Sequence, residues 1–206
     1  MTRTSVGILV FPEVEVLDFA GPFEVFSVTR LDEVTRYESV SPFEVFLVAE
    51  SREPVVATGG LRLLPEHDFE SCPPLDVLVV PGGLGTRVQV DNVRLIAWIR
   101  AEAGRVGTLT SVCTGSFLLA EAGLLDGLRA TTHWRSLDRM EVTYPRVRVK
   151  REAHVVDQGR LLTSAGISAG IDMALRVVAR FHGEGVARAT ARHMEYPYPE
   201  TNARRS

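Results

Sequence analysis

Cysteine is scarce in this chain: only Cys72 and Cys113 occur among 206 residues. Two cysteines are too few for a disulfide scaffold, and a chain of this length can bury a hydrophobic core that needs none. The five histidines are scattered without the spacing of metal ligands, and Cys72 has no second cysteine nearby. We therefore predict no metal site and no cofactor.

An excess of charge and a long apolar run are also missing. The 23 Lys and Arg residues nearly balance the 26 Asp and Glu residues, which leaves a net charge of -3 and no overall attraction for nucleic acid or an anionic membrane. No apolar run approaches the ~18 residues of a membrane span. The first one, residues 6–11, is too short for a secretion signal and is followed by Pro12 and Glu13. We expect a cytoplasmic protein that binds neither nucleic acid nor membrane.

A single domain accounts for residues 1–206, because no repeat, low-complexity tract or linker divides the chain. Hydrophobic residues make up 45% and charged residues 24%, as in globular proteins. Short apolar runs alternate with longer amphipathic ones, which indicates buried parallel strands with covering helices. The expected strands are residues 6–11, 43–49, 77–80 and 108–112. The expected helices are residues 22–29, with Pro22 at the first position, 92–103 and 115–122.

After Leu128 the pattern changes to short β-type segments. They cover residues 129–131, 147–149, 154–157 and 161–163, with a turn at Gly159 between the last two. These segments indicate a small antiparallel extension. Two further helices, residues 169–181 and 185–194, complete a predicted α/β fold with a mostly parallel central sheet.

Cys113 is the most informative residue of the chain. A β-branched run stops there and a helix begins at once, with Ser111 and Gly115 two residues before and after it. Small residues at these places are typical of a nucleophile elbow, a strained strand-to-helix turn that pushes its central side chain out above the sheet. A helix N-terminus stabilises a thiolate, so we expect a pKa below the ~8.5 of free cysteine. The alternative is a small buried hydrophobic residue in a core strand.

Two more turns are expected to converge with Cys113, because ligands bind outside the carboxyl ends of the strands in an open α/β sheet. Asp18 follows the first strand, where it is either a site residue or the N-cap of the next helix. Gly82 and Gly83 follow the third strand and either form a tight turn or present backbone N–H groups to a ligand. Cys72 lies in a proline-bounded loop without a base nearby, so we expect it to be inert.

Together these motifs resemble the DJ-1/PfpI superfamily, a flavodoxin-like group related to class I glutamine amidotransferase domains. The resemblance covers nearly the whole chain and implies a flavodoxin-like three-layer sandwich. It is carried by ILVFP (8–12), LDFAGPFEVF (17–26), VVPGG (79–83), SVCTGS (111–116), LAEAGLLDG (119–127), ATTHW (130–134) and TSAGISAGID (163–172).

Within the superfamily, an LDxxGPxEV segment paired with a CTG elbow is similar to isonitrile (isocyanide) hydratases and to the sensor halves of AraC-type regulators. Those regulators append a helix-turn-helix region, whereas this chain stops at Ser206, which favours an enzyme that stands alone. The hydrolase and glyoxalase branches carry a histidine directly after the cysteine. Thr114 takes that place here, so the resemblance disfavours peptidase and glyoxalase chemistry.

The resemblance also assigns roles by position. Cys113 matches the hydratase nucleophile, and Asp18 matches the acidic residue against its sulfur. Thr114 matches the hydroxyl residue that follows the nucleophile. Gly83, with Gly82 before it, matches a backbone donor beside the nucleophile and is expected to bind substrate.

Four further residues are candidates for the substrate pocket. Phe19, Trp134 and Ile167 would supply apolar walls. His133 follows a short predicted strand and has two interpretations. It is either a titrating partner of the cysteine across a cleft or dimer interface, or a hydrogen-bonded structural histidine.

The function expected from the resemblance is the hydration of isocyanides to N-substituted formamides through a Cys113 thioimidate. A thiolate raises the pKa of a carboxyl beside it, so Asp18 is expected to hold a proton at neutral pH and to act as acid and base. Such a lyase acts on a small molecule, and related proteins form homodimers. Two alternatives stay open: a redox-responsive protein whose Cys113 is oxidised, and a ligand-sensing module that binds a metabolite without turnover.

Overall fold

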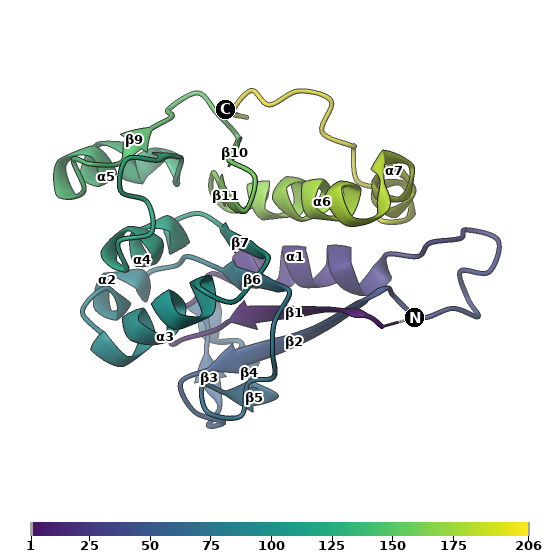
Figure 1. The fold of residues 1–206 in the computed structure, drawn as a ribbon, viewed down its shortest axis with the longest axis horizontal. Helices are drawn as coiled ribbons and strands as arrows, with labels where there is room; N and C mark the ends of the chain where they lie inside the picture. Colours follow the sequence, from purple (N-terminus) through teal and green to yellow (C-terminus); the bar gives the residue numbers. More distant parts are fainter. Residues whose placement is uncertain (1, 206) are drawn as a thin grey trace.

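A seven-stranded sheet forms the centre of the computed structural model, which describes residues 2–205. Its strand order is β10-β11-β7-β6-β1-β2-β5, which Figure 1 shows from top to bottom. Neighbouring strands pair in parallel except for β10 and β11. The strands are β1 (Thr4–Leu9), β2 (Phe43–Ala49), β5 (His67–Asp68), β6 (Val77–Val80), β7 (Thr108–Ser111), β10 (Val155–Asp157) and β11 (Leu161–Ser164).

Two groups of helices pack on this sheet. In one group, α1 contacts β1, β2, α6 and α7, and α6 contacts β10 and β11. In the other, α4 contacts β6, β7, α2 and α3. The helices are α1 (Val16–Val28), α2 (Thr86–Gln89), α3 (Val93–Ala103), α4 (Gly115–Glu121), α6 (Ala169–His182) and α7 (Glu184–His193). The predicted α/β fold with a mostly parallel central sheet is confirmed.

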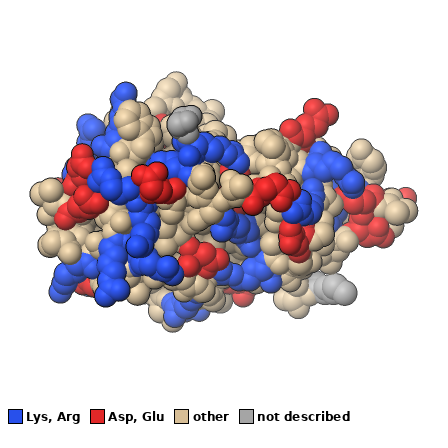
Figure 2. All heavy atoms as spheres, turned by 90° about the horizontal axis from the view of Figure 1, so that it is seen from above, with Lys and Arg blue, Asp and Glu red and all other residues tan. Residues whose placement is uncertain are grey.

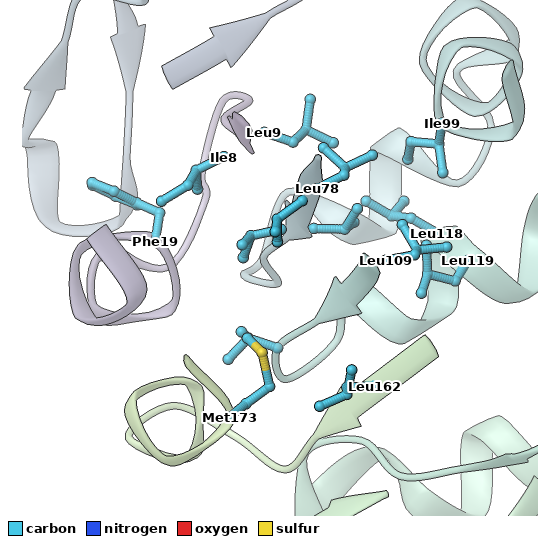
Figure 3. Packing of buried hydrophobic residues seen from close by; sticks show 14 of the residues in the cluster. Ile8, Leu9, Phe19, Leu78, Ile99, Leu109, Leu118, Leu119, Leu162 and Met173 are labelled. Carbon is cyan, nitrogen blue, oxygen red and sulfur yellow. The ribbon is translucent and has the colours of Figure 1, made fainter. Parts of the chain in front are cut away.

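The central strands are buried on both faces, as their unbroken apolar sequences predict. All four residues of β6 and the last four of β1 are buried. Figure 3 shows Leu9, Leu78, Ile99 and Leu118 gathered in this core, with Phe19 of α1 beside Ile8 of β1. This packing aligns the carboxyl ends of β1, β6 and β7, where the candidate site residues lie.

Helix α1 begins at Val16, well before the predicted start at Pro22. Proline has no N–H to donate to the carbonyl four residues earlier, which is why the prediction placed it at a helix N-terminus. In the structure Pro22 lies inside the helix, is buried and packs close to Gly170 of α6. Packing of α1 on the sheet and on α6 therefore outweighs the missing hydrogen bond. The N-cap position belongs to Glu15, so the interpretation of Asp18 as an N-cap is wrong.

The predicted extension is only partly antiparallel. Strands β10 and β11 pair antiparallel, but β11 also pairs in parallel with β7 and so belongs to the main sheet. Strands β8 and β9 pair in parallel because a helical segment connects them. The smaller elements are β3 (Val55–Val56), η1 (Thr58–Gly60), β4 (Arg62–Leu63), β8 (Arg129–Ala130), η2 (Trp134–Ser136), α5 (Leu137–Thr143) and β9 (Arg148–Val149).

Candidate active site

Cys113 lies in the turn between β7 and α4, as the sequence predicts. Its φ of 56° is in the left-handed region, which is strained for a residue with a side chain. The Cys113 N–H donates to the carbonyl of Ala165 (3.1 Å), just after β11. The Cys113 carbonyl accepts hydrogen bonds from the hydroxyls of Thr132 (2.9 Å) and Ser116 (3.1 Å). Three segments of the chain thus hold the elbow in its strained conformation.

Asp18 meets the Cys113 thiol from the first turn of α1. Its side chain is fully buried, and its Oδ2 accepts the Gly82 N–H (2.9 Å). Its Oδ1 has no hydrogen-bond partner among residues 2–205. The pKa of Asp18 is raised to about 8, mainly by burial and to a smaller extent by the negative charge of Glu15, while the Gly82 N–H and the Cys113 thiol lower it. The expected protonated carboxyl is therefore supported, although burial, and not a neighbouring thiolate, is the main cause.

The pKa of the Cys113 thiol differs from the prediction. Burial of the sulfur, followed by the charge of Asp18, raises the pKa of Cys113 well above the ordinary thiol value. The N–H and hydroxyl of Thr114 lower this pKa, but less. The predicted pKa below that of free cysteine is therefore wrong, because desolvation outweighs the helix N-terminus in a residue that is only 6% exposed. Burial also raises the pKa of Cys72 to about 11, which agrees with the inert role expected for it.

Thr114 and the two glycines are part of one hydrogen-bond network. The Gly83 N–H donates to Thr114 Oγ1 (3.0 Å), and the hydroxyl of Thr86 also reaches Thr114 Oγ1 (3.1 Å). The Gly82 N–H is used by Asp18, so both glycine donors already have partners. The structure corrects the prediction that Gly82 and Gly83 present free N–H groups to substrate: they position Asp18 and Thr114. The Thr114 N–H, in contrast, interacts with the Cys113 thiol.

The four pocket candidates occupy different environments. Phe19 is buried in the core beside Ile8, so its assignment to the pocket is not supported (Figure 3). Trp134 lies in η2, is 59% exposed and carries the guanidinium of Arg135 4.8 Å from its ring centre. Ile167 is half-buried and packs against the core.

His133 is close to the elbow. Its ring lies against Gly166, where an added Cβ would be 2.1 Å from His133 Cδ2. Its Nδ1 accepts the Arg135 N–H (3.3 Å), which supports the interpretation as a hydrogen-bonded structural histidine. Burial, together with the charges of Arg135 and Arg204, lowers the pKa of His133, so its ring is mainly neutral at pH 7.

Two residues that hold the elbow were not predicted, although both lie in motifs that the sequence displays. Thr132 belongs to the ATTHW segment and Ala165 to the TSAGISAGID segment. Thr132 follows β8 and Ala165 follows β11, so they reach the elbow from remote parts of the chain. A hydroxyl or carbonyl in such a motif carries no local signal of its partner, because tertiary folding selects the partner.

The site combines a buried carboxylic acid, a thiol and a backbone N–H donor. Within the part of the chain that the structure describes, residues 2–205, no group of three or more His, Cys, Asp and Glu side chains is arranged to hold a metal ion. The residues present can therefore supply a sulfur nucleophile and a proton to one substrate atom.

Comparisons with known proteins agree with this architecture. Residues 4–180 match the DJ-1/PfpI family. The chain is 39% identical to the isonitrile hydratase of Pseudomonas putida, over 93% of this chain and 78% of that protein. It is 34% identical to the HTH-type transcriptional regulator GbdR of Pseudomonas aeruginosa, over 69% of this chain but only 38% of the regulator. The crystal structure of a ThiJ/PfpI family protein from Pseudomonas syringae superimposes with a TM-score of 0.82 at 32% identity, covering 98% of this chain and 79% of that one.

Proposed function

Since the chain belongs to the DJ-1/PfpI family, we propose that it hydrates isocyanides to N-substituted formamides, with Cys113 as nucleophile and Asp18 as acid and base. The observation that carries this proposal is the fully buried Asp18 carboxyl, with a pKa raised to about 8 by burial, against the Cys113 thiol. The similarity to an isonitrile hydratase over 93% of the chain supports it.

The first step adds the thiol across the terminal carbon of the isocyanide. A bond forms between the Cys113 sulfur and that carbon, Asp18 gives its proton to the same carbon, and the thiol proton passes to Asp18. The product is a thioimidate in which every proton is accounted for. The Gly82 N–H occupies Oδ2 of Asp18, so Oδ1 is the oxygen that carries the mobile proton. This relay needs no free thiolate, which agrees with the raised pKa of Cys113.

The second step hydrolyses the thioimidate. Water adds its oxygen to the carbon, one water proton goes to the substrate nitrogen, and the other returns to sulfur as the carbon–sulfur bond breaks. Asp18 is placed to carry the proton to the departing sulfur, since it lies against that atom. The Thr114 N–H stabilises negative charge on sulfur as it leaves.

The proposal is tested with an aryl isocyanide and the purified protein. Cys113→Ser is expected to abolish formamide formation, and Asp18→Asn to lower kcat by about 10²- to 10⁴-fold because general acid catalysis is lost. Cys72→Ser is the matched control and keeps wild-type activity, since Cys72 lies in a separate loop. In wild type, kcat falls as the pH rises through about 8, where Asp18 loses its proton. Equal rates for wild type and Cys113→Ser would contradict the mechanism.

The two alternatives, redox sensing by Cys113 and ligand sensing without turnover, predict other results. Oxidation of Cys113 requires a thiolate, and the raised pKa of this thiol disfavours it at neutral pH. Mass spectrometry after mild peroxide treatment, compared with formamide turnover, separates redox sensing from catalysis. A ligand-sensing module, as in the regulators similar to this chain, would instead bind a small molecule tightly and release it unchanged.

A further inference from the structure

The segment from Tyr196 to Arg205 crosses the molecule as a strap from α7 to β10, and Figure 1 shows it in yellow along the top. At its beginning, the hydroxyl of Tyr196 donates to the buried carboxylate of Asp172 in α6 (2.9 Å), which also pairs with Arg205 (2.9 Å). Figure 2 shows the face that the strap crosses, on which Lys and Arg side chains gather. These contacts hold both ends of the strap against α6.

The strap pairs with the edge of the sheet near its far end. The His154 N–H donates to the carbonyl of Asn202 (3.0 Å), and the Asn202 side chain makes two hydrogen bonds with the backbone of Val155. The Arg204 N–H donates to the carbonyl of Glu152 (2.9 Å). This backbone pairing sets the position of the Arg204 side chain.

The guanidinium of Arg204 reaches inward to the loop after β8. Its Nη2 donates to the hydroxyl of Thr131 (2.6 Å) and to the carbonyl of Thr132 (3.1 Å). Its Nε donates to the carbonyl of Arg151 (2.6 Å). The same loop continues into His133, whose pKa the charge of Arg204 lowers. Arg204 therefore links the strap to the loop that faces Cys113.

Thr132 completes the connection, because its hydroxyl donates to the Cys113 carbonyl (2.9 Å). Cys113 holds a strained φ of 56°, and such a conformation persists only when several contacts impose it. A guanidinium that donates from several N–H groups in a fixed planar arrangement orders its surroundings more strongly than a neutral side chain can.

We propose that Arg204 is a positioning residue, which fixes the Thr131–Thr132 loop so that the Thr132 hydroxyl holds the Cys113 elbow in its reactive conformation. The kinetic consequence rests on the proposed hydratase function. The structural consequence, a well-ordered Cys113 elbow, does not depend on that function.

Arg204→Gln tests this proposal with two measurements. The kcat for an aryl isocyanide is expected to fall by about 10- to 100-fold, with a smaller change in KM, because the nucleophile is misplaced. The rate of Cys113 alkylation by iodoacetamide is expected to rise severalfold, because a loosened elbow exposes a sulfur that is now buried. Arg204→Lys keeps a charged donor and is expected to return both quantities part of the way to wild type. The pKa of His133, followed by NMR, rises in Arg204→Gln.

Arg176→Gln is the matched control, because Arg176 donates to Asn202 of the strap (2.8 Å) without contacting the Thr131–Thr132 loop. It is expected to keep wild-type kcat and alkylation rate. In a double-mutant cycle, Arg204→Gln and Thr132→Val are expected to be non-additive, since both act through one hydroxyl.

Folded Arg204→Gln protein with the kcat and alkylation rate of Arg176→Gln would overturn the proposal. Additive effects in the cycle would overturn it as well. If wild type forms no formamide from any isocyanide, the proposed function fails, and the alkylation measurement still decides the role of Arg204.

Discussion

At the scale of single residues, the raised pKa of Asp18 distinguishes this site from an ordinary acid and thiol pair. Desolvation favours the neutral carboxyl, and the Gly82 N–H, which favours the charged form, offsets only part of that effect. The result is a carboxylic acid with a pKa of about 8 beside a thiol. In the mechanism proposed above, this pair would deliver a proton and a nucleophile at neutral pH without prior formation of a thiolate.

The raised pKa of Asp18 predicts a pH-dependent stability. Its pKa is about 8 in the folded protein against 3.8 as the ordinary value, so the folded state binds the proton more tightly. This contribution is fully present below pH 4 and is lost as the pH rises from about 4 to 8. Relative to Asp18→Asn, wild type is expected to lose about 1.4 kcal/mol of unfolding free energy per pH unit in that range.

Urea denaturation of both proteins at pH 5, 6 and 7 measures this difference. The amide of the Asp18→Asn variant keeps an oxygen for the Gly82 N–H but does not titrate, so the slope belongs to the carboxyl. Parallel stability curves for wild type and Asp18→Asn would show that Asp18 is ionised in the folded state.

At the scale of elements, the turn after β6 packs directly on the start of α4. A Cβ added to Gly82 would lie 2.5 Å from the Thr114 nitrogen, and one added to Gly115 would lie 2.1 Å from the Val80 carbonyl oxygen. These two glycines let the backbone of the turn approach the elbow closely enough for Gly82 to bind Asp18. The close approach of β6, its turn and α4 is therefore possible because Gly82 and Gly115 have no side chains.

Gly82→Ala is expected to destabilise the protein by about 1–3 kcal/mol, because the new methyl group overlaps backbone atoms that cannot move aside. Activity is expected to fall further than stability, since the elbow and Asp18 shift apart. Thermal denaturation and kcat measure the two effects. Gly185→Ala is the matched control, because no atom lies within 4 Å of the added Cβ, and its stability should change by no more than about 1 kcal/mol.

At the scale of the whole molecule, the fold places apolar surface beside the site. Trp134 in η2 is 59% exposed, and Leu84, which directly follows Gly83, is 55% exposed. Contiguous exposed apolar patches are typical of surfaces that another protein covers, so these two side chains are candidates for an interface that mutation can test. Within residues 2–205, no helix is long and apolar enough to cross a membrane.

The homodimer expected from the family resemblance stays a prediction. Sedimentation equilibrium is expected to give twice the 22.7 kDa mass of the chain. Replacing both exposed side chains, in Leu84→Ser with Trp134→Ser, is expected to shift the equilibrium toward the monomer if this surface forms the interface. A wild-type monomer at micromolar concentration would contradict the prediction, and a dimer unaffected by the substitutions would place the interface elsewhere.

The sequence predicted the strands β1, β2, β6 and β7 and the helices α3, α4, α6 and α7, but not the short elements β3, β4, β5, α2 and α5. It also singled out Cys113 at an elbow, whereas the roles of Asp18 and Thr114 came from the family resemblance and stay predictions. Strand and helix periods, breaker residues and small residues around an elbow are local signals, because neighbouring residues determine φ and ψ. The same local reasoning failed at Pro22, where packing outweighs the proline rule, and at β8 and β9, where a connecting helix makes the pair parallel.

Only the tertiary structure decided the pKa values of Cys113 and Asp18 and the contacts that hold these two residues in place. Asp18 and its partner Gly82 are 64 residues apart, and Arg204 and Thr132 are 72 apart, so no spacing along the chain reveals either contact. Two scarce cysteines were enough to identify the candidate nucleophile. Its raised pKa and that of Asp18 depend on burial, which exists only after the chain has folded and excluded water.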